Sequence, residues 1–237
     1  MNISLRKIST ISTLKFKLFS RNMYFAVLPL MIIGLAILYK FMLKDMQQLG
    51  LTMVVEMNLG MVGIPLTAYM IAEEKEKNTL RALMTSSVSA MDYLIGSSVL
   101  PFVITVGLNL ILPLILNIPY SDINIPMYGL LTVLSTVSMI IIGFSFGITA
   151  KSQSQVSTNV LPISIIVALL PTFSNMSTIV KQISDFTITG VFSNYITEML
   201  ENKSYMLDLK SWLIIAAWLI IPMIIFIFVY KKNGMDE

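Results

Sequence analysis

Six apolar stretches constrain this chain more than any other feature of its sequence. They cover residues 23–39, 50–71, 93–117, 126–149, 156–173 and 212–230. A helix needs roughly 20 mostly apolar residues to cross the hydrocarbon core of a bilayer. Charged residues make up only 12% of the 237 residues, about half of what soluble domains carry. We therefore expect a single all-α membrane domain (1–237) with six transmembrane helices.

Lysine and arginine predict the orientation of these spans. Six spans place both termini on one side of the membrane. If that side is the cytoplasm, eleven of the 16 basic residues fall in inner segments and five in outer ones. Inner segments of membrane proteins carry such an excess. We expect a multi-pass protein of the plasma membrane with both termini cytoplasmic.

Residue types that the sequence lacks exclude several kinds of chemistry. The chain has no histidine and no cysteine. It therefore cannot form an HExxH zinc site, a histidine proton relay or a Ser-His nucleophile. It has no GxxxxGK[ST] phosphate loop for ATP. We expect no catalytic residue, metal site or cofactor in this chain, and no nucleic-acid partner.

Two amphipathic regions flank the spans. In residues 1–22, Ile8, Ile11, Leu14 and Leu18 recur at helical spacing, which predicts a helix lying on the inner leaflet. A disordered basic leader is the alternative, and Lys15 is expected to snorkel from the edge of the apolar face.

The apolar pattern of residues 174–211 predicts two short helices at the outer surface. Its apolar residues recur at helical spacing in two sets, a weaker one around Ile179 and Ile183 and a stronger one from Val191 to Leu200. Gly190 is expected to separate the two helices. Because bare loops do not occur in lipid, the pair can form an outer re-entrant hairpin.

The densest charge lies in the segment 72–92, between the second and third spans. Asn78 is a plausible left-handed helix terminator, and Thr79 can then cap a new helix. Ser89 and Asp92 have the spacing of a capping box that starts the third span. In the helix between them, the residues expected on one face are Leu80, Leu83, Met84 and Val88.

Residues 74–89 read EKEKNTLRALMTSSVS and resemble the E-x-E-[KR]-G-T-L-E-x-L-L-x-[ST]-P-[VI]-[ST] stretch of ABC-2 type transporter permeases. The expected layout is similar to that family: an N-terminal interfacial helix, six spans and an outer hairpin before the last span. Three positions differ. Asn78 stands where the family has glycine, Arg81 where it has an acidic residue, and Ser87 where it has proline.

The resemblance implies a coupling helix that docks on a separate ATPase subunit, which holds ATP and Mg²⁺. The implied coupling residues are Glu74, Glu76, Thr79, Leu80, Arg81, Leu83, Met84 and Val88. It also implies a second permease subunit, identical or similar, surrounded by membrane lipid. The implied function is export of amphipathic or antimicrobial peptides or hydrophobic drugs. Export of polysaccharide or lipid-linked glycan is the alternative, followed by ion-coupled secondary transport.

Polar residues within the spans are candidates for a pathway or gate. Glu56 and Asn58 fall near the outer end of the second span, and Gly190 falls in the outer hairpin. Carboxylates at membrane depth usually face protein or water. A hydrogen bond from Glu56 to the hairpin is an equally good explanation of its presence. Gly143 and Gly147 have the GxxxG spacing that allows two helices to approach closely.

Overall fold

The computed structural model describes residues 4–44, 46–84 and 88–233. All regular structure in these ranges is helical. The first half contains α1 (Leu5–Arg21), α2 (Met23–Met42), α3 (Gln47–Asn58), the π-helical η1 (Leu59–Gly63), α4 (Ile64–Glu76), α5 (Thr79–Met84) and α6 (Ala90–Ile115). The second half contains η2 (Tyr120–Asp122), α7 (Ile125–Thr149), α8 (Gln153–Asn159), α9 (Leu161–Leu169), η3 (Ser174–Met176), α10 (Thr178–Asp185), α11 (Ile188–Glu201) and α12 (Leu209–Asn233). The prediction of an all-α fold is confirmed.

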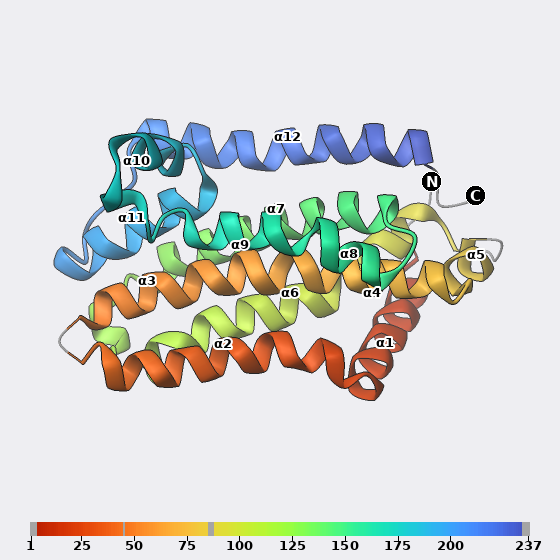
Figure 1. Cartoon of the computed structure of the whole chain (residues 1–237), viewed down its shortest axis with the longest axis horizontal. Helices are drawn as coiled ribbons and strands as arrows, with labels where there is room; N and C mark the ends of the chain where they lie inside the picture. The colour runs from red at the N-terminus through yellow and green to blue at the C-terminus, as the bar shows by residue number, and fades with distance from the viewer. Residues whose placement is uncertain (1–3, 45, 85–87, 234–237) are drawn as a thin grey trace.

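The long helices lie side by side as a bundle with two distinct ends (Figure 1). At one end, called the α5 end, α1 runs across the bundle beside α5, and α12 finishes there. At the other, called the α11 end, α10 and α11 lie beside the start of α12. Within the described residues, five helical segments are long and apolar enough to cross a membrane: 25–42, 47–76, 90–115, 125–149 and 209–232.

The stretch 156–173, predicted as the fifth span, does not form one long helix. It folds as α8 and α9, which meet at Val160 and run beside α3, η1 and α4 (Figure 1). Pro162 sits in the first turn of α9. Proline has no backbone N–H to donate and its ring crowds the preceding turn, so it favours the start of a helix over its interior. The break therefore follows from the sequence.

One helical rod, α3–η1–α4, forms the centre of the bundle. In an apolar stretch of 18 residues of this rod, 78% of the residues are buried, whereas the corresponding shares in α2 and α12 are 22% and 17%. The rod packs against α2, α6, α7, α9 and α11. The prediction of close approach at the GxxxG spacing is confirmed, because a Cβ on Gly143 would lie 2.6 Å from the Ile64 carbonyl oxygen. At Gly147 it would lie 2.9 Å from Cβ of Ile71.

The central rod is interrupted halfway by the π-helical turn η1. A π-turn inserts one residue into an α-helix and often occurs at functional sites. On its α11 side, α3 packs against α2, α9 and α11. On its α5 side, α4 packs mainly against α7 and α8. The turn thus divides the central rod into two halves whose main neighbours differ, while α6 and α9 contact both.

Candidate functional site

The joint between α4 and α5 was predicted as a stop followed by a new helix, and the structure confirms that order. Asn78 has a positive φ of 55°, as expected for a left-handed terminator. Thr79 differs from the prediction, because its hydroxyl donates back to the Glu74 carbonyl at 3.1 Å. It therefore satisfies the end of α4, whose last carbonyls lack helical partners.

The predicted capping box at the start of α6 is also confirmed. Ser89 Oγ accepts from the Asp92 backbone N–H at 3.1 Å, and Asp92 Oδ2 accepts from the Ser89 N–H at 3.3 Å. The other carboxylate oxygen of Asp92 accepts from the Ser4 N–H at 2.9 Å. The start of α6 is therefore fixed to the start of α1. Residues 85–87 of the predicted coupling helix lie outside the described residues.

A buried ion pair joins α1 to the end of α4. Lys15 is fully buried, and its Nζ lies 2.7 Å from Glu74 Oε2. The Tyr93 hydroxyl of α6 donates to the same carboxylate oxygen, and the ammonium lies 5.1 Å from the Tyr93 ring centroid. The expectation that Lys15 snorkels to the surface is therefore wrong. The ion pair with Glu74 offsets the cost of burying the ammonium, since buried charges in proteins are paired or coordinate metals.

The remaining charged residues at the end of α4 each contact a different part of the chain. Glu73 pairs with Lys77 and accepts from Asn22 Nδ2, between α1 and α2, at 3.3 Å. Lys75 donates to the Ile148 carbonyl of α7. Glu76 accepts from the N–H of the first residue of α8 at 3.1 Å. Hydrogen bonds and ion pairs thus connect the end of α4 to α1, α6, α7 and α8.

The apolar face of α5 points mostly into the chain itself. Leu80 is only 3% exposed, and with half-buried Leu83 and Val88 it packs in a cluster that includes Ile11 and Tyr93. Leu80 and Glu74 are thus not available for the direct partner contact that the sequence suggested, because both are covered by their own chain. They hold α5 in place instead.

Other predicted coupling residues differ in exposure. Glu76 and Thr79 are exposed at the α5 end. The side chains of Arg81 and Met84 lie outside what the structure describes. The surface that remains for a partner at this end therefore includes Glu76, Thr79 and the exposed part of Leu83.

Glu56 connects the central rod to the α11 end. Its carboxylate is 1% exposed, and Oε2 accepts from Thr172 Oγ1, just beyond α9, at 2.9 Å. Ser193 of α11 is its second hydroxyl neighbour. The measured hydrogen bond thus goes to Thr172, two residues before the predicted hairpin 174–211, and Ser193 is the neighbour that the hairpin contributes. Glu56 also lies farther from the end of its helix than predicted, nine residues or about 14 Å beyond the start of α3.

Asn58 belongs to a separate polar cluster beside the π-turn. Its Nδ2 donates to the Thr105 carbonyl at 2.8 Å and to Asn109 Oδ1 at 2.7 Å. The Tyr128 hydroxyl donates to the Asn109 carbonyl at 2.8 Å. Asn58 and Glu56 are therefore not brought together, and the Asn58 cluster joins α3 to α6 and α7.

Gly190 lies in the first turn of α11 and not between the two helices, as was predicted. The chain breaks at Phe186 and Thr187, where Thr187 Oγ1 caps α11 by accepting from the Gly190 N–H at 3.0 Å. A Cβ on Gly190 would lie 2.0 Å from the Ser184 carbonyl oxygen. Glycine is needed here because the end of α10 contacts its backbone.

Sequence reasoning missed the Lys15–Glu74–Tyr93 cluster, although a signal was present. Lys15 follows Ile11 by four residues and Ile8 by seven, so it belongs to the apolar stripe of α1. A lysine on such a stripe next to a segment rich in glutamate is a candidate for a buried pair.

Comparison with known proteins does not assign the chain to a family. No protein-family model matches its sequence, and no curated protein matches it significantly.

Proposed function

We propose that this chain is the membrane subunit of an ATP-driven exporter of the ABC-2 type. The observation that carries the proposal is the joint at the α5 end: a short helix held between a terminated α4 and a capped α6. The resemblance of residues 74–89 to the coupling segment of that family supports it. The proposed exporter contains two such permease chains and two separate ATPase subunits.

The proposed membrane placement has both termini and α5 in the cytoplasm, α1 on the inner leaflet and α10–α11 at the outer surface. The central rod of 30 residues is about 45 Å long, longer than the hydrocarbon core of about 30 Å. Its charged end therefore projects beyond the core, where the proposal places the ATPase. In this arrangement α8–α9 is the fifth of six crossings in chain order, with η3 and the hairpin at its outer end.

The contacts at the end of α4 support a route for mechanical coupling. A displacement of α5 acts directly on α4 and α6, because only short connections join them. The Lys15–Glu74 pair makes α1 follow the same movement. The close contacts of Gly143 and Gly147 pass it from α4 to α7. At η1 the movement reaches the half of the rod that carries Glu56 and contacts α11.

The proposed cargo is an amphipathic peptide or a hydrophobic drug. This choice rests on the family resemblance, and glycan export remains the alternative cargo. The chain itself would perform no covalent chemistry, and ATP and Mg²⁺ would bind the partner.

Cysteine cross-linking tests the proposal, because the native chain has no thiol. Thr79→Cys places a thiol on the exposed start of α5, and Ser204→Cys places one at the exposed α11 end. With the co-expressed ATPase encoded by a neighbouring gene, a thiol-reactive cross-linker should join that ATPase to Cys at position 79 only. Equal cross-linking from both positions, or none from either, would reject the docking site.

Buried Glu56 favours one second candidate, an ion-coupled transporter, because ionisable residues within a membrane often lie on ion pathways. The variant Glu56→Gln distinguishes the ion-coupled transporter from the ATP-driven exporter. In an ion-coupled transporter it should abolish dependence of transport on the ion gradient. In the proposed exporter, transport should depend on ATP hydrolysis in wild type and variant alike, and a collapsed gradient should leave both unchanged.

A further inference from the structure

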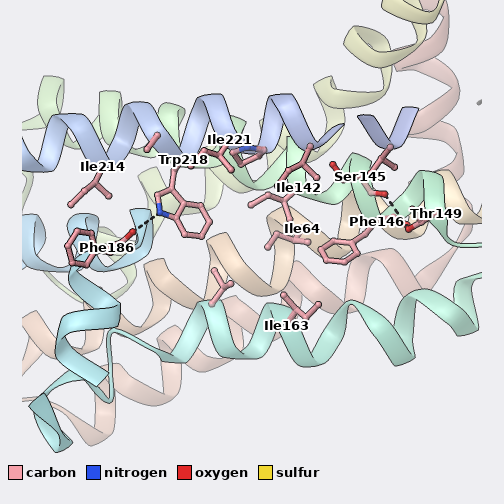
Figure 2. A pocket seen from close by; sticks show the side chains of 15 residues that line it. Ile64, Ile142, Ser145, Phe146, Thr149, Ile163, Phe186, Ile214, Trp218 and Ile221 are labelled. Carbon is pink, nitrogen blue, oxygen red and sulfur yellow. Dashed lines mark hydrogen bonds between the residues drawn. The ribbon is translucent and has the colours of Figure 1, made fainter. Parts of the chain in front are cut away.

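An apolar groove runs along α12 and has a volume of about 680 Å³. Figure 2 shows α12 and α9 on opposite sides of it, with the side chains of Ile64, Ile142 and Phe146 between them. The Trp218 side chain lies within the groove, towards the end where Ile214 and Phe186 are found. The groove is therefore a feature of the bundle's side and not of its ends.

The polar atoms that line the groove are already paired within the chain. The Trp218 indole N–H donates to the Phe186 carbonyl at 2.7 Å. The Ser145 hydroxyl donates to the Ile141 carbonyl at 3.1 Å, and the Thr149 hydroxyl donates to the Phe146 carbonyl at 2.9 Å. A ligand in the groove would find only apolar surface, which a hydrocarbon chain matches.

A polar pocket begins where the groove ends. Ile214 lines both, and the pocket has a volume of about 360 Å³. Its charged residues are Lys181, Asp185, Glu198, Asp208 and Lys210. The ammonium of Lys210 lies 5.1 Å from the ring centroid of Phe186, which itself lines the groove. A positive charge therefore stands at the junction of the apolar and polar sites.

Two of the three carboxylates in the pocket are engaged locally. Asp185 accepts from Asn194 Nδ2 at 3.1 Å. Asp208 accepts from the Ser211 N–H in the first turn of α12 at 2.9 Å, and hydrogen bonds from Ser211 lower its pKa. Glu198 is exposed on the rim. The pocket thus holds three carboxylates and two ammonium groups, and Lys210 also acts on Asp208, so its mixed charges match a zwitterionic headgroup with an amine and not a simple anion.

We propose that the groove and the polar pocket form one binding site for a membrane phospholipid whose headgroup carries an amine. The phosphate lies at Lys210 and Lys181, the amine at Glu198, and an acyl chain fills the groove. The lining of α12 from Ile214 to Val229 extends about 22 Å. One leaflet contributes about 15 Å of the hydrocarbon core, so a full acyl chain is accommodated.

The headgroup must supply the selectivity. Acyl chains gain little by leaving other lipids for an apolar protein surface, because both are equally apolar. A phosphatidylethanolamine presents both a phosphate and an amine to the pocket. A phosphatidylglycerol has no amine and would face Glu198 without a partner.

The test uses the full chain in phosphatidylglycerol nanodiscs that contain a small fraction of phosphatidylethanolamine with a photoreactive acyl chain. Mass spectrometry measures the ratio of labelling on α9 and α12 to labelling on α2. Ala217→Trp, which fills the groove, should lower that ratio severalfold. Gly34→Trp is the matched control, because it stands eight residues from the outer end of α2 with open space around it.

The headgroup contact is tested separately in the same nanodiscs. Lys210→Glu should lower the labelling ratio about threefold, the size expected for one partly exposed ion pair. A photoreactive phosphatidylglycerol should give a lower ratio than the ethanolamine lipid on the wild-type chain. Unchanged labelling in Ala217→Trp, or equal ratios for the two lipids, would overturn the site. Efficient disulfide cross-linking between two copies that carry Ala217→Cys, with no lipid labelling of the groove in the wild-type chain, would overturn it too.

Discussion

The buried Lys15–Glu74 pair allows a quantitative test of how α1 is attached. We predict that Lys15→Met destabilises the protein by about 3–5 kcal/mol, the usual cost of leaving one member of a buried ion pair without its partner. The estimate applies because the Lys15 and Glu74 side chains are 1% and 7% exposed and their charged atoms lie 2.7 Å apart. The Tyr93 hydroxyl would still donate to the carboxylate but would not neutralise its charge.

A double-mutant cycle isolates that interaction. Glu74→Gln keeps an acceptor for the Tyr93 hydroxyl, so Lys15→Met/Glu74→Gln should recover most of the lost stability. The free energy of unfolding is measured by denaturant titration of the purified protein. Lys17→Met is the control, since this lysine is exposed on the same helix, and should change stability by less than about 0.5 kcal/mol. If Lys15→Met behaves like the control, or the two substitutions are additive, the pair does not secure α1.

Three further predictions address the hairpin, the π-turn and the orientation. Gly190→Ala should destabilise the hairpin by about 2 kcal/mol, because its Cβ would meet a backbone oxygen at 2.0 Å, whereas Gly129→Ala, in open space, should be neutral or stabilising in the same unfolding assay. Deletion of Met61 should convert η1 to α-helix and preserve folding, since a π-turn holds one extra residue. The variant should lose transport activity but keep the ATPase subunit, and a misfolded product would contradict this prediction. In intact cells an impermeant thiol reagent should label Ser204→Cys and not Ser9→Cys, both of which are exposed, and the reverse pattern would invert the proposed topology.

Local signals in the sequence predicted much of the helical architecture. Asn78 and the Ser89–Asp92 pair were readable because a left-handed stop and a capping box depend on neighbouring residues alone. The spacing of Gly143 and Gly147 was readable for the same reason, since both lie on one face of α7. The all-α class followed from the length of the apolar stretches.

Features that depend on distant partners were not predictable in the same way. The sequence places Lys15 on an apolar stripe, but only the fold brings it to Glu74, 59 residues away in the chain. The apolar face of α5, predicted to contact a partner protein, is partly buried, because α1 and α6 cover Leu80. Gly190 was read as a break, but the close approach of α10 determines its role. Periodicity identifies a face and does not show what covers it.

The central claim is that α5 connects this chain to an ATPase, and retention of that subunit by Leu83→Asp tests it most directly. Leu83 is half-buried, so a partner can cover the part that remains exposed. Loss of an interface anchor costs about 2 kcal/mol, or roughly thirtyfold in affinity. Ser9→Asp puts the same charge on exposed α1 at the same end of the bundle and serves as the control.

Both variants are purified in detergent with the co-expressed ATPase, after their insertion and unfolding midpoints have been compared with wild type. The proposed mechanism predicts that Leu83→Asp loses the ATPase and transport while Ser9→Asp keeps both. Normal ATPase retention and transport by a correctly folded Leu83→Asp protein would contradict the coupling role of α5.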